Sequence, residues 1–203
     1  MRKNILAMSA MTLVVLSGSA AAAATNGQLT FNWQGVVPTA PVTSGAWAFV
    51  DGLDIPFTPV TEALNIVSNA ASVDITALKP TSFFIVPVTG PVTAGVPVTR
   101  NTTGTVNSIN AFLGSAPVSG GFVGNKQLNL STATTPAVGE VAITLNGQSL
   151  KVGSASPLSV TPSAAAGSET PIEISMSAKA APSDVTDGAA VSFTAPVVFA
   201  VDI

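Results

Sequence analysis

The sequence predicts an all-β fold, a β-sandwich of short strands joined by turns. Several segments alternate apolar and polar residues with a period of two, which is typical of strands buried on one face. Turn formers are frequent, with 17 Gly and 15 Pro among 203 residues, and they separate these segments. Charged residues make up only 8% of the chain, far below the roughly 25% of globular proteins. So little charge indicates a subunit whose surface is covered by neighbours.

The first 23 residues have the features of a secretory signal peptide. Arg2 and Lys3 give a positive start, residues 5–16 are mostly apolar, and residues 19–24 are small. The apolar stretch is too short to span a membrane. We therefore expect cleavage after Ala23 and export of the remaining chain.

The exported chain is expected to begin with an amphipathic strand at residues 29–37. One face carries Leu29, Phe31, Trp33, Gly35 and Val37, and Thr, Asn and Gln separate the first four of them. Chain ends are commonly frayed, so a terminal strand with such large apolar side chains needs an apolar groove to enter. That groove lies either in its own domain or in another molecule.

The chain after this segment is predicted to be one domain. Asn146-Gly147 is the favoured two-residue hairpin turn, and it predicts the pairs Ile143 with Leu150 and Val141 with Val152 on one face. Residues 106–113 could instead form a short helical segment. The expected strands are 29–37, 45–50, 62–68, 72–78, 82–88, 127–132, 140–145, 148–153, 170–179 and 190–203.

The C-terminus also predicts a long strand that is apolar on one face. Pro196 lies within it and cannot donate to a β-ladder, which predicts a bulge or an edge there. The apolar face consists of every odd position to the last residue: Val191, Phe193, Ala195, Val197, Phe199, Val201 and Ile203.

The composition argues against an enzyme, a metal site and a cofactor. The chain has no Cys, His or Tyr, which excludes disulfides, thiol chemistry, imidazole catalysis and Cys or His metal ligands. Two carboxylate pairs remain, Asp51 with Asp54 and Asp184 with Asp187. Each pair adjoins a glycine, and Asp-Gly favours a turn over catalysis or a weak calcium site.

The charge balance also argues against nucleic-acid binding. Without Arg2 and Lys3, five basic residues face ten acidic ones, a net charge of −5. No basic cluster supplies the electrostatic footprint that nucleic acid requires.

The sequence resembles a known family of exported subunits. Residues 26–37, Asn-Gly-Gln-Leu-Thr-Phe-Asn-Trp-Gln-Gly-Val-Val, resemble the N-terminal extension of chaperone–usher pilins. The whole mature chain, including residues 84–88, 121–128 and 199–203, is similar to major fimbrial subunits of the coli-surface-antigen type, made by enterotoxigenic intestinal bacteria. The resemblance implies an incomplete immunoglobulin-like β-sandwich, completed by donor-strand exchange with the next subunit.

The resemblance also implies partners, site residues and boundaries. A periplasmic chaperone would lend a strand, and an outer-membrane usher would exchange it for the next subunit's extension. Many pilins carry a disulfide and a penultimate Tyr, whereas this chain has no Cys and has Asp202 in that place. The implied layout is a signal peptide at 1–23, an extension at 24–38 and a sandwich domain at 39–203. The implied donor residues are Leu29, Phe31, Trp33, Gly35 and Val37, and the implied groove strand, also the chaperone contact, contains Val191, Phe193, Val197, Phe199, Val201 and Ile203.

The expected function is that of a structural major subunit of an adhesive surface fimbria, which supports bacterial attachment to host cells. Its partners would be copies of itself in a head-to-tail filament, together with a minor tip subunit and a host receptor. Two alternatives stay open. One is a minor or tip adhesin that binds a host glycan or protein, and the other is a monomeric secreted β-sandwich.

Overall fold

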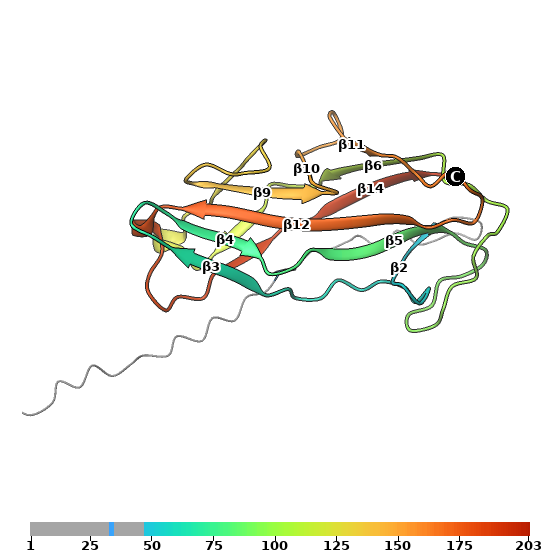
Figure 1. The fold of residues 1–203 in the computed structure, drawn as a ribbon, viewed down its shortest axis with the longest axis horizontal. Coiled ribbons are helices and arrows are strands. Elements are labelled where there is room, and N and C mark those ends of the chain that lie inside the picture. Colours follow the sequence, from blue (N-terminus) through green and yellow to red (C-terminus); the bar gives the residue numbers. More distant parts are fainter. Residues whose placement is uncertain (1–32, 35–46) are drawn as a thin grey trace, which may run out of the picture.

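The computed structural model describes residues 33–34 and 47–203, which form strands and two short 3-10 turns (Figure 1). No helix in these residues is long and apolar enough to cross a membrane. The turns are η2 (Val123–Asn125) and η3 (Pro182–Asp184). The strands are β1 (Trp33–Gln34), β2 (Trp47–Val50), β3 (Leu64–Ser68), β4 (Val73–Ala77), β5 (Thr81–Pro87), β6 (Ser108–Leu113), β7 (Val118–Gly120), β8 (Asn129–Leu130), β9 (Glu140–Leu145), β10 (Gln148–Ser149), β11 (Leu158–Val160), β12 (Thr170–Ala180), β13 (Ser192–Thr194) and β14 (Val197–Asp202).

The first layer is an eight-stranded sheet centred on β12. β12 is 11 residues long and pairs antiparallel with β9 along one side. Along its other side it pairs first with β5 and then with β4, which lie end to end. β2 and β3 extend the sheet beyond β5 and β4, and β8 and β10 flank β9.

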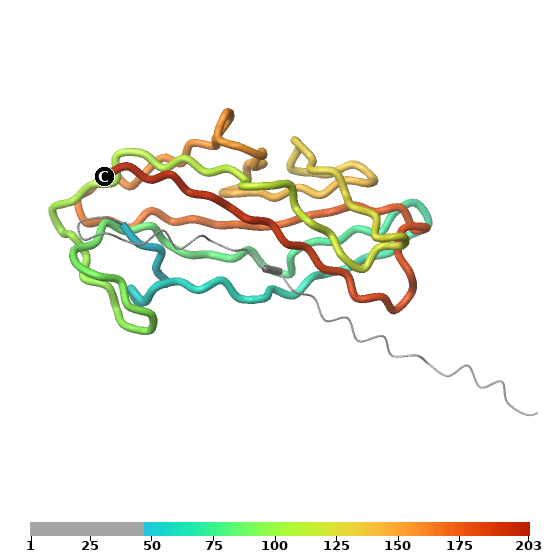
Figure 2. Tube along the Cα trace, turned by 180° about the vertical axis from the view of Figure 1, so that it is seen from behind, coloured from blue at the N-terminus to red at the C-terminus, as the bar shows by residue number. Residues whose placement is uncertain are grey.

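The second layer is built around the C-terminal strands β13 and β14. β7 pairs with β13, β6 pairs with β14, and β11 adds to the far side of β6. Seen from behind, these strands pass in front of the first sheet (Figure 2). The two layers enclose one main apolar core, so the predicted all-β class is confirmed.

An aromatic cluster joins the two layers. The ring of Phe83, only 1% exposed, lies 5.4 Å from Phe49, 4.7 Å from Phe57 and 5.9 Å from Phe199 between ring centroids. Phe49, Phe57 and Phe83 belong to the first layer or its connections, and Phe199 belongs to β14. Edge-to-face and stacked pairs of this kind add to the stability that apolar burial gives.

The predicted hairpin is confirmed at its turn and wrong at its outer pair. Asn146 and Gly147 have φ of 47° and 76°, as a type I′ turn requires, and the Leu150 amide donates to the Ile143 carbonyl at 2.8 Å. Val152 does not pair with Val141 and is 47% exposed. It bridges Leu113 instead, because the chain leaves β9 after Leu150 and crosses to β6.

The suggested helical segment at 106–113 is wrong, because residues 108–113 form β6. Ile109, Ala111 and Leu113 are buried and alternate with half-buried neighbours. Ala111 is too small to mark the buried face in the sequence, whereas Ile109 and Phe112 have helical spacing. The sequence also predicts no strand at the positions of β7 and β11. Of the predicted strand at 29–37, only Trp33 and Gln34 lie within the described residues.

Candidate functional site

The candidate site is the long edge made by the C-terminal strands. β14 pairs antiparallel with β6 along its whole length, from Val197 opposite Leu113 to Asp202 opposite Ser108. On its other side, β14 has no strand partner among the residues that the structure describes. An unpaired edge presents a row of free N–H and C=O groups, which is a template for another strand.

The predicted groove residues alternate along this edge as expected, with burial that weakens toward the C-terminus. Val197 is 5% exposed and Phe199 is 9% exposed, whereas Val201 and Ile203 are half-buried. Val191 and Phe193, on the approach to the edge, are each 1% exposed. The ring of Phe199 lies 5.2 Å from that of Phe49, so the buried face of β14 packs against the first layer.

Among the residues that the structure describes, a two-residue strand from the N-terminal segment lies beside β13. Trp33 and Gln34 form β1, which pairs in parallel with β13, with Trp33 opposite Phe193 and Gln34 opposite Thr194. The other predicted donor residues, Leu29, Phe31, Gly35 and Val37, lie outside the described residues. The structure therefore brings one predicted donor residue next to one predicted groove residue, within the same chain.

The sequence predicts one strand over residues 190–203 with a bulge or an edge at Pro196, but the structure has two strands, β13 and β14, on either side of this proline. β13 ends at Thr194 and β14 begins at Val197. The Pro196 carbonyl accepts a hydrogen bond from the Gly114 amide at 2.9 Å, but the proline has no N–H to continue the ladder. The strands that pair with them are interrupted at the same level, because β6 ends at Leu113 and β7 begins at Val118. The interruption divides the edge into a short part, β13, and a longer part, β14.

The carboxylate pairs form turns and ion pairs, as the turn interpretation predicted. The Asp51 carboxylate accepts hydrogen bonds from the amides of Leu53 and Ile55, at 2.8 and 3.0 Å. Asp184 pairs with Lys126 at 2.7 Å, and the turn containing Asp187 is closed by a bond from the Ala189 amide to the Thr186 carbonyl. Within residues 47–203, no group of three acidic side chains could hold a metal ion.

One polar cluster could not be anticipated from the sequence. Arg100 contacts Asp54 and Glu169, each at 2.6 Å. The hydrogen bond to Asp54 is the main cause that raises the pKa of Arg100 above its ordinary value. The partners lie 46 and 69 residues away in sequence, so no local pattern marks them. The cluster ties together three loops at one end of the molecule.

Comparison with known proteins identifies the family. No protein-family model and no solved structure matches the chain. The chain is 64% identical to the CS5 fimbrial subunit of Escherichia coli over 205 aligned residues, which cover 100% of both proteins. This similarity extends over the N-terminal segment and the strands of both layers, including β13 and β14. The chain therefore belongs to the family of the CS5 fimbrial subunit.

Proposed function

We propose that this chain is the structural major subunit of an adhesive surface fimbria. The subunit polymerises when the N-terminal extension of one copy pairs along the C-terminal strands of the next. The observation that carries the proposal is the outer edge of β14, which has no strand partner among the described residues. The chain that carries this edge belongs to the family of a fimbrial subunit. A strand added along such an edge is a recurring mode of protein association.

The residues that would drive this exchange are the two amphipathic sets at the chain ends. The donor set is Leu29, Phe31, Trp33, Gly35 and Val37, and the acceptor set is Val191, Phe193, Val197, Phe199, Val201 and Ile203. Burial of the four large donor side chains contributes about 1.5–3 kcal/mol each, or roughly 6–12 kcal/mol together. A domain is stabilised by only about 5–15 kcal/mol in total. One inserted strand therefore decides whether a subunit is stable.

The layout of the precursor follows from the same proposal. Residues 1–23 act as the signal peptide, residues 24–38 as the extension, and residues 39–203 as an immunoglobulin-like sandwich that lacks one strand. A periplasmic chaperone covers the edge of β14 until an outer-membrane usher replaces it with the next extension. The assembled filament supports attachment to host cells, with a minor tip subunit and a host receptor as further partners.

A self-completed monomer is the second candidate, and β1 favours it. Trp33 and Gln34 pair with β13 of their own chain, as they would in a secreted sandwich that needs no neighbour. A lone chain, however, has only its own extension to place at this edge. In a filament, the extension of a neighbouring subunit competes for the same position.

Deletion of residues 24–37 tests the proposal. We expect the shortened subunit to be recovered with its chaperone but to form no filaments, because it cannot supply a strand to its neighbour. Electron microscopy of cells that also express the chaperone and usher measures this. Normal filaments from the shortened subunit would contradict donor-strand assembly. If the deletion instead unfolded an isolated monomer, the self-completed monomer would be the better account.

A matched pair of point variants tests which face of the extension is buried. Trp33→Asp is expected to abolish filaments, because it places a charge on the apolar face. Gln34→Asp, one residue away, is expected to leave them intact, because neighbouring strand residues point to opposite faces. Equal loss of filaments in both variants would show that the alternation has no role in assembly.

A further inference from the structure

A polar groove lies between two edge strands, β10 of the first layer and β11 of the second (Figure 1). Among the residues that the structure describes, each of these strands ends the strand order of its sheet. The groove consists of two hollows of about 370 and 270 Å³, and Gln148 of β10 and Leu158 of β11 line both of them. We call it the β10–β11 groove. Two adjoining hollows suit a ligand of several linked units.

Side chains that form hydrogen bonds make up most of the lining of this groove. No carboxylate is among the described residues that line either hollow. Leu158, half-buried where the hollows meet, adds an apolar contact. The lining therefore suits a ligand rich in hydroxyl groups. The hydroxyls of the lining come from Thr132, Thr134, Ser149 and Ser156 in the larger hollow, and from Ser159 and Thr161 in the smaller one.

Lys151 gives the larger hollow a positive charge. It is exposed, and none of the four ion pairs among the described residues includes it. Its backbone is fixed, because its carbonyl accepts a hydrogen bond from the Leu113 amide at 2.8 Å. After residue 23 the chain has only five basic residues against ten acidic ones. A cation in a hollow without carboxylates therefore marks a local preference for an anion.

Ser149 adds a buried hydroxyl that lacks a partner. Its Oγ is the one buried side-chain nitrogen or oxygen atom without a hydrogen bond in the part of the chain that the structure describes. Buried polar groups in folded proteins are nearly always hydrogen-bonded, so this atom requires an explanation. Ser149 also lines the larger hollow, so the missing bond lies at the wall of the groove.

We propose that the β10–β11 groove binds an acidic oligosaccharide of the host surface. A carboxylate or sulfate of the sugar pairs with Lys151, and its hydroxyl groups exchange hydrogen bonds with Gln148 and the Ser and Thr side chains. The Ser149 hydroxyl turns toward the sugar and gains the bond that it lacks in the free chain. Hydrogen bonds to a charged group are roughly twice as strong as neutral ones, so Lys151 selects acidic sugars. The inference rests on the proposed function, since it assigns the contact with the host to the shaft subunit itself.

The lengths of the edge strands favour a saccharide over a peptide as the occupant. A peptide that adds a strand to a sheet binds through the free backbone groups of an edge. β10 has two residues and β11 has three, and edge strands this short offer few such groups. The side chains of the groove, in contrast, offer hydroxyls, an amide and a cation. These are the groups that recognise a sugar acid.

A glycan array tests the class of ligand. The mature full chain, as isolated subunits and as filaments, is applied to lactose, sialyllactose and sulfated lactose, and to other neutral cores with their sialylated and sulfated forms. Bound protein is detected by antibody. We expect at least one acidic form to retain about tenfold more protein than its neutral core. No binding, or equal binding of acidic and neutral forms, would overturn the proposal. So would displacement of the protein by an oligoglutamate peptide of the same charge, because the groove would then bind acidic peptides.

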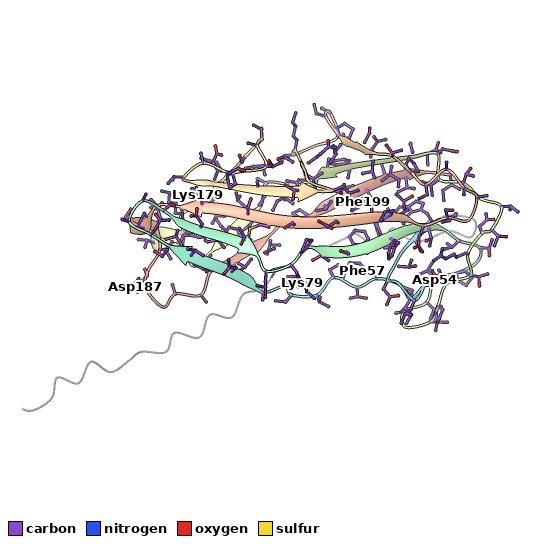
Figure 3. The ribbon with its side chains drawn as sticks, in the orientation of Figure 1. Asp54, Phe57, Lys79, Lys179, Asp187 and Phe199 are labelled. Atoms are coloured by element: carbon purple, nitrogen blue, oxygen red, sulfur yellow. The ribbon has the colours of Figure 1, made fainter. Side chains whose placement is uncertain are left out.

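Lys151→Ala tests the position of the site. It is expected to weaken binding to the acidic sugars by about tenfold or more, because a charged hydrogen bond is lost, and Lys151→Arg should retain most of the binding. The matched control is Lys79→Ala, which removes the other lysine that has no ion pair among the described residues. Figure 3 shows Lys79 below β12, whereas β10 and β11 lie above β12 in the same view (Figure 1). Equal loss of binding in the two alanine variants would overturn the site.

Ser149→Ala separates binding from folding. We expect binding to weaken about threefold or more, while the melting temperature does not fall, because no hydrogen bond of the free chain is removed. Binding equal to that of the unchanged chain would contradict the contact assigned to Ser149.

The outcomes separate this proposal from strand exchange. If the subunit without residues 24–37 forms no filaments and Lys151→Ala leaves sugar binding unchanged, the groove alone is wrong. If that subunit polymerises normally and sugar binding depends on Lys151, the strand exchange alone is wrong.

Discussion

Phe83→Ala is expected to lower the free energy of unfolding by about 3–5 kcal/mol, as large-to-small aromatic changes in a core do. Phe83 is 1% exposed, and its ring contacts those of Phe49, Phe57 and Phe199. The change leaves a cavity where the two layers meet and removes three aromatic contacts. For a chain of this size the melting temperature should fall by about 6–20 °C, measured by circular dichroism on the full mature chain.

Phe112→Ala is the matched control for this prediction. It removes the same atoms, but Phe112 is half-buried on β6 and belongs to no aromatic pair among the described residues. Its smaller loss of buried area should lower the free energy of unfolding by about 1–2 kcal/mol. Equal destabilisation by the two variants would show that the contact between the layers does not depend on the Phe83 cluster.

The strands that could be predicted are those whose own residues mark a buried face. β12 and β9 alternate large apolar and small or polar residues over six or more positions, and the predicted ranges 170–179 and 140–145 lie close to their observed bounds. The strand predicted at 190–203 is apolar on one face as expected, but the structure divides it into β13 and β14. The turn at Asn146-Gly147 was predictable for a local reason, because both residues tolerate the positive φ of a type I′ turn. Local chemistry determines these features, and the sequence contains all of it.

The features that could not be predicted depend on residues far away in the chain. β7 and β11 are three residues long, too short for a period to be visible. The sequence predicts Val152 on the buried face of a hairpin strand, but the chain after β10 crosses to β6, where Val152 forms an isolated bridge with Leu113. Arg100 similarly gains its two carboxylate partners from distant loops.

The candidate site shows the same division. Alternation in residues 191–203 specifies which face of the strand is buried, and the structure confirms it as far as Phe199. A period of two carries no information about which strand lies alongside, or whether that strand belongs to the same molecule. Pairing depends on chain connectivity and on which subunits are present, so the partner of β14 has to be tested by assembly experiments.

Gly121→Ala is expected to destabilise the subunit strongly, because a methyl group has no room at this position. Gly121 has φ of 85°, and an added Cβ would lie 1.8 Å from the Ala190 carbonyl oxygen and 3.0 Å from the Val191 Cα. These backbone atoms directly precede β13, so relief of the clash would displace the C-terminal strands β13 and β14. We expect a loss of about 2–5 kcal/mol in the free energy of unfolding, from the positive φ and the overpacking together.

Gly90→Ala isolates the contribution of that close approach. Gly90 has nearly the same φ, 84°, but an added Cβ would meet no atom within 4 Å. It should therefore show only the conformational cost of the left-handed region, about 1–2 kcal/mol. Thermal unfolding of the two variants side by side measures the difference. If Gly121→Ala unfolded at the same temperature as Gly90→Ala, Ala190 would not press against this glycine, and the β7–β13 contact would have more space than the structure allows. If Gly121→Ala unfolded earlier and also formed fewer filaments, the position of β13 would be linked directly to assembly, because this strand leads into the edge that receives the donor.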